Sequence, residues 1–410
     1  MMEGWKKVIL EYLGFVGRGK SRHRPRNAAF LYSDKYPFIQ TADVKSANNK
    51  ISKYSQMYSE EGLKQSKLWP KNTLCITIAA NIADAGILDL EACFPDSVIG
   101  FIPDSKKSDV QFVKYLFDIL QVSIKQISQG AAQDNLSLEK LRSINFLVPP
   151  LPTQHRIAKI LSAYDDLIEN NLKRIKLLEE MAQKTYEEWF IRFKFPGYET
   201  AVFDEESGLP EGWKMVRIKD IGTVITGKTP STTKPEFYDG DVPFIKTPDM
   251  SDYPYVLNTN QYLSDKGANT QKNKFLQKNS VVVSCIGTAG KFALVSRISQ
   301  TNQQINAVVF NDEIYQFYFY GFSNYLKPLL EQLGSNGATM TNVNKGKFEN
   351  IKIVLPKRII LEDYHKLVKN SFDVILSLLE QNQHLKEARD ILLPRLMTGM
   401  IDVEQLELKL

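Results

Sequence analysis

The sequence predicts an α+β protein in which two strand-rich mixed α/β domains are joined by two long helices that pair antiparallel as a coiled coil. Three observations support this prediction. The chain repeats itself at a spacing of about 207 residues. Each copy contains β-branched and aromatic runs broken by turns, and each ends in a long heptad pattern. A chain of 410 residues is also too long for one ordinary core.

The internal repeat is visible in four blocks that recur in the same order. EGWKKV returns as EGWKMV, and PFI returns as PFI. LWPKNTLCITIAANIADAG parallels FLQKNSVVVSCIGTAG, and GAAQDNLSLEKLRSINFLVPP parallels GATMTNVNKGKFENIKIVLP. The segments between these anchors differ freely. One architecture is therefore used twice with different content, as an internal duplication.

The order of elements within each copy sets the expected domain boundaries. Strand-like runs such as TLCITI and SVVVSCI, bounded by Gly, Asn and Pro turns, indicate strand-rich domains at 1–150 and 197–356. A proline block follows each domain, and a helical pattern follows the prolines. We expect spacer helices within 151–196 and 357–410, the second with a C-terminal tail.

Both helical segments space their seam residues alternately by four and three positions, with charged residues between. The first seam contains Ile157, Leu161, Tyr164, Ile168, Asn171, Ile175 and Leu178, and the second contains Tyr364, Val368, Ser371, Ile375, Leu378, Asn382 and Leu385. We expect the helices to end before Phe195 and near Pro394, with lengths of roughly 60 and 50 Å. A whole domain connects them, which favours antiparallel pairing. The alternative is that each helix packs only on its own domain.

The composition is that of an ordinary globular protein, with 43% hydrophobic and 24% charged residues. The net charge of +5 permits a polyanionic partner without requiring one. Three scattered cysteines make a disulfide framework or a zinc site improbable and suit a reducing compartment. We expect no signal peptide, no membrane span and a cytoplasmic location.

Two stretches match the phosphate-loop pattern G-x-x-x-x-G-K-[ST]: GFVGRGKS at 14–21 and GTVITGKT at 222–229. A working phosphate loop must leave a strand and open a helix, whose N-terminus holds the phosphates. Prolines follow both matches, and neither is followed by a helical stripe. A nucleotide-binding enzyme that uses both loops remains the alternative function from the enzyme class.

Other catalytic patterns are weaker still. Phe15–Gly19 fits one form of the S-adenosylmethionine-binding glycine loop, but the second copy does not, and the Asn/Asp-Pro-Pro-Phe/Tyr motif is absent. The four histidines show no metal-ligand spacing, and paired acids on the predicted helices are expected on solvated faces. We therefore predict no catalytic residue, no cofactor site and no metal site on this chain.

Binding chemistry remains, centred on loops that recur at equivalent positions. RGKSRHRPR carries five cations without an acid, as a phosphate-tracking loop would, although a solvated charge run is the simpler reading. The other loops carry side chains that can contact phosphates or base edges. The candidate DNA-binding residues are Arg18, Lys20, Arg22, Arg24, Arg26, Asn81, Gln133, Lys228, Thr229, Ser231, Lys234, Thr288, Lys291, Asn336, Thr339 and Thr341.

Over essentially its full length the chain resembles the specificity subunit of type I restriction–modification systems. The resemblance rests on LPEGWKMVRIKDIGTVITGKTPST, LVPPLPTQHRIAKIL, LLEEMAQKTYEEWFIRF, SNGATMTNVNKGKFENIKIVLP and LLPRLMTG. The first copy departs from it, with GRGKSRHRPRN in place of GKTPST and no LP before EGW. The alternative without nucleic acid is a coiled-coil interaction scaffold.

The resemblance implies two target-recognition domains, each reading one half of a split site on double-stranded DNA, with pseudo-twofold symmetry. The partners it implies are two modification subunits, which bind S-adenosylmethionine and methylate adenine, and restriction subunits that use ATP. The chain itself would be non-catalytic and would carry no cofactor.

Overall fold

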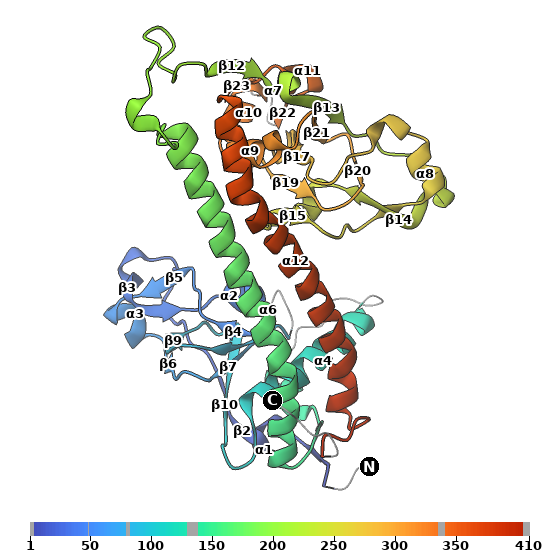
Figure 1. The fold of residues 1–410 in the computed structure, drawn as a ribbon. Helices are drawn as coiled ribbons and strands as arrows, with labels where there is room; N and C mark the ends of the chain where they lie inside the picture. Colours follow the sequence, from blue (N-terminus) through green and yellow to red (C-terminus); the bar gives the residue numbers. More distant parts are fainter. Residues whose placement is uncertain (1–3, 48, 79–82, 129–137, 335–340, 405–410) are drawn as a thin grey trace. The chain divides into compact units, whose positions relative to one another are not determined.

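The computed structural model describes residues 4–47, 49–78, 83–128, 138–334 and 341–404. The chain forms two compact units. The first unit comprises Met1–Asn170 with Asn382–Leu410, and the second comprises Asn171–Gln381. Each unit holds one strand-rich domain together with part of the two long helices, α6 (Leu151–Tyr186) and α12 (Arg358–Met397) (Figure 1).

Each unit contains a five-stranded sheet with the same strand order and the same pairing directions. Adjacent strands are antiparallel except at the last pair, β8 with β4 and β19 with β15, which is parallel. The first sheet is β2 (Gly14–Arg18), β10 (Val98–Pro103), β7 (Leu74–Thr77), β8 (Ala85–Leu88) and β4 (Lys50–Ile51). The second is β13 (Gly222–Thr226), β21 (Ile305–Phe310), β17 (Val281–Ser284), β19 (Phe292–Val295) and β15 (Tyr255–Val256). The duplication predicted from the repeat is thus present as duplicated topology.

Two kinds of smaller sheet are also duplicated. In the first unit they are β5 (Gln56–Tyr58), β3 (Tyr32–Phe38), β9 (Ala92–Cys93) and β6 (Leu68–Trp69), and β1 (Lys6–Val8) with β11 (Phe146–Val148). In the second they are β16 (Tyr262–Leu263), β14 (Tyr238–Ile245) and β20 (Gln300–Thr301), and β12 (Lys214–Arg217) with β23 (Lys352–Leu355). The two-stranded ribbons join the start of each domain to the segment that precedes its long helix. A further ribbon in the second unit pairs β18 (Ile286–Gly287) with β22 (Thr341–Asn342).

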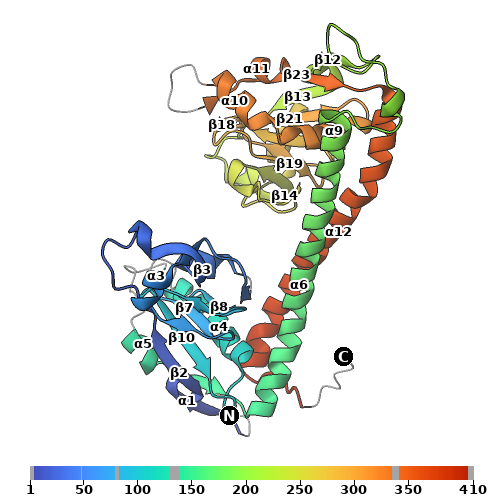
Figure 2. The same cartoon turned by 90° about the vertical axis from the view of Figure 1, so that its left-hand side faces the viewer.

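Further helices lie beside the sheets of each unit (Figure 2). Those of the first unit are α1 (Leu10–Leu13), α2 (Thr41–Ser46), α3 (Glu60–Lys64), α4 (Val110–Ser128) and α5 (Leu138–Ser143). Those of the second are α7 (Ile218–Ile221), α8 (Asp265–Asn269), α9 (Ile314–Ser323), α10 (Leu326–Gly334) and α11 (Lys345–Glu349). None of the helices within the described ranges is long and apolar enough to span a membrane.

Two of the repeat anchors are positions where the backbone is left-handed. Gly4 and Gly212 have φ of 81° and 80°, and Asn72 and Asn279 have φ of 67° and 64°. Glycine and asparagine are the residues that adopt this region at least cost, because a larger side chain would crowd the following carbonyl. The anchors therefore recur because each domain makes the same two turns.

Within each unit α6 and α12 run antiparallel side by side (Figure 1). In the second unit Asn171 Nδ2 donates to Gln381 Oε1 at 2.8 Å, and Tyr364 donates to the Ala182 carbonyl at 3.4 Å. In the first unit Asn382 Nδ2 lies 3.5 Å from the Ile168 carbonyl oxygen. The predicted seam residues are buried except Tyr164, Leu178 and Leu385, which are half-buried.

The C-terminal end of α12 differs from the expectation. The helix was expected to end near Pro394, but it runs three residues further, to Met397. Pro394 costs the helix one backbone hydrogen bond, and the final turn is still closed by Thr398, whose N–H donates to the Pro394 carbonyl at 3.1 Å. Leu393, Leu396 and Met397 are buried in the core of the first unit, and this burial favours the longer helix.

Candidate nucleic-acid interface

The first phosphate-loop match is a strand, not a loop that opens a helix. Residues 14–18 form β2, and the chain after it makes no helical turn until a short 3₁₀ turn at Ala29–Leu31. The N–H groups of Gly19 and Lys20 donate to the carbonyls of Val98 and Phe94, at 2.9 and 3.0 Å. Backbone amides that already pair within the sheet are not offered to a phosphate.

The second match has the same geometry. Residues 222–226 form β13, and the N–H groups of Gly227 and Lys228 donate to Ile305 and Thr301, at 3.2 and 3.0 Å. A Cβ at Gly227 would lie 2.2 Å from the Asn302 carbonyl oxygen. The glycines of this pattern thus permit close backbone packing, and the nucleotide-loop interpretation is wrong at both copies.

The five cations at the end of β2 and in the loop after it fall into two groups. Arg18 donates to the Asp96 carbonyl, Arg26 forms an ion pair with the Asp96 carboxylate at 2.7 Å, and Arg24 donates to carbonyls of its own loop. These three fix the loop's shape. Lys20 and Arg22 are exposed, and no intramolecular partner for either side chain is found among the described residues. They are the cations best placed to meet a polyanion.

The loop of the second copy offers fewer charges. Lys228 is exposed, and Thr229 donates to Gln303 at 2.7 Å. Ser231 bonds Thr233 at 2.8 Å, and Lys234 lies with Nζ 5.3 Å from the centre of the Phe237 ring.

The remaining candidates lie on other loops. Thr288 and Lys291 are exposed in the turn between β18 and β19, and Lys291 Nζ is 3.5 Å from the Met250 carbonyl oxygen. Thr341 pairs with Gly287 in the β22–β18 ribbon. Four of the predicted residues lie outside the described residues: Asn81, Gln133, Asn336 and Thr339.

Each basic loop is fastened to the neighbouring small sheet by a tyrosine. Tyr32 donates to the Arg26 carbonyl at 2.8 Å, and Tyr238 donates to the Pro230 carbonyl at 2.7 Å. The two tyrosines begin the equivalent strands β3 and β14. The loops are therefore held at the same place on the two domains.

The structure adds polar residues that sequence reasoning did not single out. Gln40 Nε2 donates to Gln56 Oε1 at 2.9 Å, and Lys246 Nζ donates to Gln261 Oε1 at 2.6 Å. The signal was present, because PFIQT in the first copy aligns with PFIKT in the second. In the first unit the Gln pair lines a hollow of about 250 Å³; the other lining residues are Ser21, Arg26, Asn27, Tyr32, Phe38 and Pro95.

A lysine on two aromatic rings lies beside Lys20. Lys67 Nζ is 3.8 Å from the centre of the Trp69 ring and 4.8 Å from that of Phe15, whose side chain is exposed. Burial lowers the pKa of Lys67, and the nearby Lys20 lowers it further. This lysine extends the positive surface of the basic loop.

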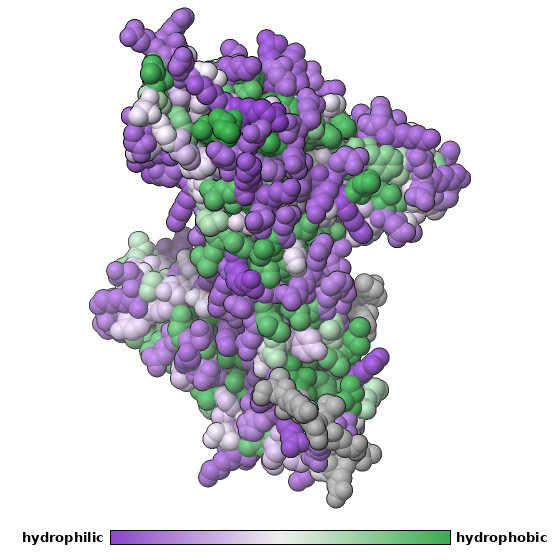
Figure 3. Space-filling view, in the orientation of Figure 1, coloured by the Kyte–Doolittle hydropathy of each residue, from purple (hydrophilic) through white to green (hydrophobic). Residues whose placement is uncertain are grey.

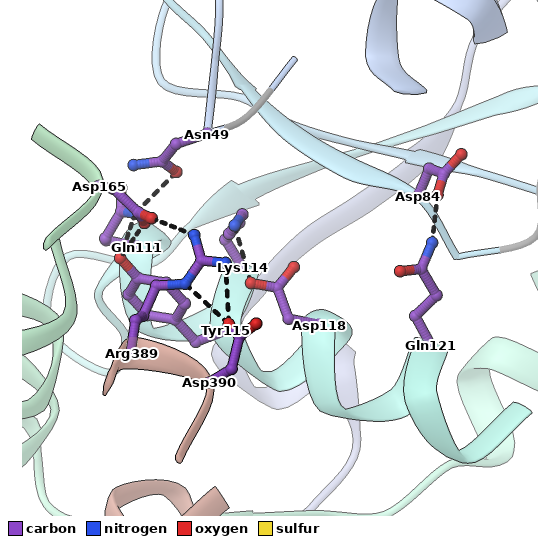
Figure 4. Close-up of polar contacts among 10 residues, drawn as sticks. All are labelled: Asn49, Asp84, Gln111, Lys114, Tyr115, Asp118, Gln121, Asp165, Arg389 and Asp390. Atoms are coloured by element: carbon purple, nitrogen blue, oxygen red, sulfur yellow. Dashed lines mark hydrogen bonds and ion pairs between the residues drawn. The ribbon is translucent and has the colours of Figure 1, made fainter. Parts of the chain in front are cut away.

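A buried polar network anchors the first domain to its helices (Figure 4). Tyr115 of α4 donates to Asp165 of α6 at 2.6 Å, and Arg389 of α12 donates to the other oxygen of Asp165 at 2.6 Å. The side chain of Asp165 is only 3% exposed. Lys114 pairs with Asp118 at 2.7 Å, and burial raises the pKa of Asp118 despite that lysine. The network fixes how α4 lies on the helix pair.

The second domain is anchored by a similar bond. Tyr320 of α9 donates to Glu179 of α6 at 2.8 Å. Burial raises the pKa of Glu179, while the hydrogen bond from Tyr320 lowers it. In both units, therefore, a tyrosine from the domain's main helix bonds a carboxylate of α6.

Within the described ranges, no group of three His, Cys, Asp or Glu side chains could hold a metal ion. Cys75, Cys93 and Cys285 are buried free thiols. Burial raises the pKa of the Cys93 and Cys285 thiols to about 11, so both stay protonated and unreactive at neutral pH.

Comparison with known proteins gives a consistent family. The model of the type I restriction modification DNA specificity domain matches residues 2–180 and 210–370. The type I restriction enzyme HindI specificity subunit of Haemophilus influenzae is 31% identical over 67% of this chain and 72% of its own length. The MjaIX specificity subunit of Methanocaldococcus jannaschii is 27% identical over 87% of this chain and 84% of its own.

A solved structure shares the fold. The type I restriction–modification S subunit from M. genitalium superposes with a TM-score of 0.61 at 16% identity, covering 96% of both chains. The matched residues include most of both strand-rich domains, most of α6 and the first part of α12. The chain therefore belongs to the type I restriction–modification DNA specificity family, as a recognition subunit and not an enzyme.

Proposed function

We propose that the chain reads a split target on double-stranded DNA, with one half-site for each strand-rich domain. The observation that carries the proposal is the duplicated frame: two domains share sheet order, turns and a tyrosine-fastened loop, while the polar side chains on that frame differ. A common frame with different side chains can give two independent base preferences. In this proposal DNA is bound by the two strand-rich domains, at residues 1–150 and 197–356. The helical segments, at residues 151–196 and 357–410, set the distance between these domains.

Phosphate contacts would come from the exposed cations of the two basic loops. We expect Lys20→Ala with Lys228→Ala to weaken duplex binding and to reduce the slope of log K against log salt by about 2, since each phosphate contact contributes about 0.9. The methylated sequence should stay the same, because phosphate contacts carry no base information. Lys53→Ala with Lys272→Ala, two exposed lysines outside these loops, is the matched control. Equal salt slopes for both double variants would return the loops to a structural role.

The long helices would set the distance between half-sites. Half-sites one helical turn apart lie about 34 Å centre to centre, a distance that long helices can span. Deleting one heptad from each helix should change the number of base pairs between the half-sites and leave their sequences unchanged. Altered half-sites at an unchanged spacing would contradict this role.

The partners would be two modification subunits, which hold S-adenosylmethionine and methylate adenine, and restriction subunits that use ATP. A hollow of about 500 Å³ on the helices of the second unit suits a partner helix. Its lining includes Leu177 and Leu367, whose side chains are 65% and 51% exposed. Apolar surface follows the course of α6 between hydrophilic patches (Figure 3). Such exposed apolar surface usually marks an interaction site.

The docking surface is tested by co-purification with a modification subunit. Leu177→Asp should reduce the amount of modification subunit that copurifies, because it places a charge in an apolar contact. Val202→Asp, at an equally exposed apolar residue outside the hollow, should have no effect. Equal recovery for both variants would exclude this surface.

The function as a whole is tested by co-expressing the chain with a modification subunit in the cytoplasm of a host and mapping N6-methyladenine across the genome. A split motif with a fixed gap is the expected result. Continuous motifs, or methylation without a motif although the complex forms, would contradict the proposal.

A further inference from the structure

The two polar pairs at the ends of β3 and β14 occupy equivalent positions. Gln40 N donates to Asp43 Oδ2 at 2.7 Å, and Lys246 N donates to Asp249 Oδ2 at 2.8 Å. Both domains therefore make the same turn, in which a backbone N–H donates to the carboxylate of an aspartate three residues later. Gln40 and Lys246 therefore correspond, although one is neutral and the other charged.

Their partners correspond as well. Phe38 is the register partner of Gln56, and Phe244 N donates to the Gln261 carbonyl at 3.1 Å. In both domains, therefore, a glutamine (Gln56 or Gln261) lies opposite the phenylalanine of the neighbouring strand. Its side chain bonds the residue two positions after that phenylalanine. The first domain carries a Gln–Gln pair, the second carries a Lys–Gln pair, and the surrounding backbone is unchanged.

The two pairs offer different hydrogen-bonding groups to a ligand. Two glutamines carry two carbonyl oxygens and two amide nitrogens, so the pair can both donate and accept beyond its internal bond. The lysine carries only donors, and the one carbonyl oxygen of its pair already accepts from it. In the major groove adenine presents a donor at N6 and an acceptor at N7, whereas guanine presents acceptors at O6 and N7.

The pairs lie where base edges would be met if the basic loops hold the backbone. In the first unit Gln40 and Gln56 line the same hollow as Arg26 and Asn27 of the basic loop. In the second unit Lys228 N donates to the Thr301 carbonyl at 3.0 Å, and Thr301 is the register partner of Ile245, the residue before Lys246. The side chains of Gln56 and Gln261 are exposed, so a ligand can reach both pairs.

We infer that these pairs are specificity-determining residues: Gln40 with Gln56 reads an adenine in the first half-site, and Lys246 with Gln261 reads a guanine in the second. The inference rests on the proposed function, which it deepens by naming the residues that choose a base pair. According to this inference, the first domain recognises one A·T base pair through Gln40 and Gln56, and the second domain recognises one G·C base pair through Lys246 and Gln261.

The test exchanges the two chemistries. The full chain, co-expressed with its modification subunit, carries either Gln40→Lys or Lys246→Gln, and N6-methyladenine is mapped. Gln40→Lys should change one A·T pair of the first half-site to G·C, with the second half-site and the gap unchanged. Lys246→Gln should change one G·C pair of the second half-site to A·T. Lys53→Gln and Lys272→Gln, at exposed lysines elsewhere, should leave the motif intact.

A second measurement covers a variant that methylates too weakly to map. Duplexes with each of the four base pairs at every position of the wild-type half-sites are titrated with each purified complex, and thermal unfolding confirms folding. The preferred base pair should shift at one position by roughly fivefold or more in affinity, as expected for one bidentate contact. Folded variants with the wild-type motif and the wild-type base preference would overturn the inference. A wild-type complex that yields no split motif would instead refute the proposed function.

Discussion

The bond between Asp165 and Arg389 makes a sharp prediction about stability. The Asp165 carboxylate is almost fully buried, whereas the Arg389 side chain is 21% exposed. Arg389→Met keeps much of the side chain's length and removes its charge. Among the described residues, the Tyr115 hydroxyl is then the remaining side-chain donor to this buried carboxylate. Burying a charge without its partner is costly, because the protein replaces only part of the lost hydration.

The expected cost follows from this geometry. Removing one partner of a buried ion pair costs about 3–5 kcal/mol. The residual bond from Tyr115 and the partial exposure of Arg389 reduce this to about 2–4 kcal/mol. For a unit of roughly 200 residues, 1 kcal/mol shifts the midpoint by about 2–4 °C, so the first-unit transition should fall by about 4–16 °C.

The assay is calorimetry and urea denaturation of the full chain, with Lys386→Met, an exposed lysine on the same helix, as the matched control. Asp165→Asn combined with Arg389→Met should be more stable than Arg389→Met alone, because no buried charge remains. The double-mutant cycle should give a coupling of about 1–3 kcal/mol. A single variant within about 0.5 kcal/mol of the control, or a coupling near zero, would refute the reasoning.

Three further predictions concern other parts of the fold. Truncation after Gln381 removes four buried residues of the first core, Leu393, Leu396, Met397 and Val403. Each contributes about 1.5–3 kcal/mol to the free energy of unfolding, so their combined loss approaches the whole stability of a domain. Calorimetry should then show only the unfolding transition of the second unit, and a retained first-unit transition would contradict this. His365 is buried, and burial lowers its pKa, so between that lowered pKa and about 6.5 the unfolded chain binds more protons than the folded chain. The stability of the second unit should therefore fall as the pH drops through this window, and His365→Phe should flatten the dependence of the unfolding midpoint on pH between pH 5 and 8. Equal pH dependence for the wild type and the variant would count against this prediction. Gly4→Ala and Gly212→Ala should each lower the free energy of unfolding, measured by urea denaturation, by about 1–2 kcal/mol, because both glycines have a left-handed backbone. Asn72→Gly should leave it nearly unchanged, and unchanged urea midpoints for the two alanine variants would be inconsistent with left-handed turns at these positions.

The α+β class, the duplication and the two long helices were all predictable from the sequence, because they arise from local patterns. Period-two and heptad spacings reflect the geometry of strands and helices, and a repeat at constant offset brings the same patterns back. The sequence showed that Gly4 and Gly212, and Asn72 and Asn279, occupy equivalent positions of the repeat. The left-handed backbone at these positions explains why glycine and asparagine recur there.

The candidate interface was less predictable, because its geometry depends on contacts between residues far apart in the chain. Sequence reasoning treated the five cations of the first loop alike, but Asp96, about 70 residues later, occupies Arg26 and helps to hold Arg18. Gln56 and Gln261 became visible only when the strands placed them beside Gln40 and Lys246. Likewise, the C-terminal turn of α12 belongs to the first core because Leu393, Leu396 and Met397 find their apolar partners there. Such partners are selected by burial and hydrogen bonding in three dimensions, and no spacing along the chain encodes them.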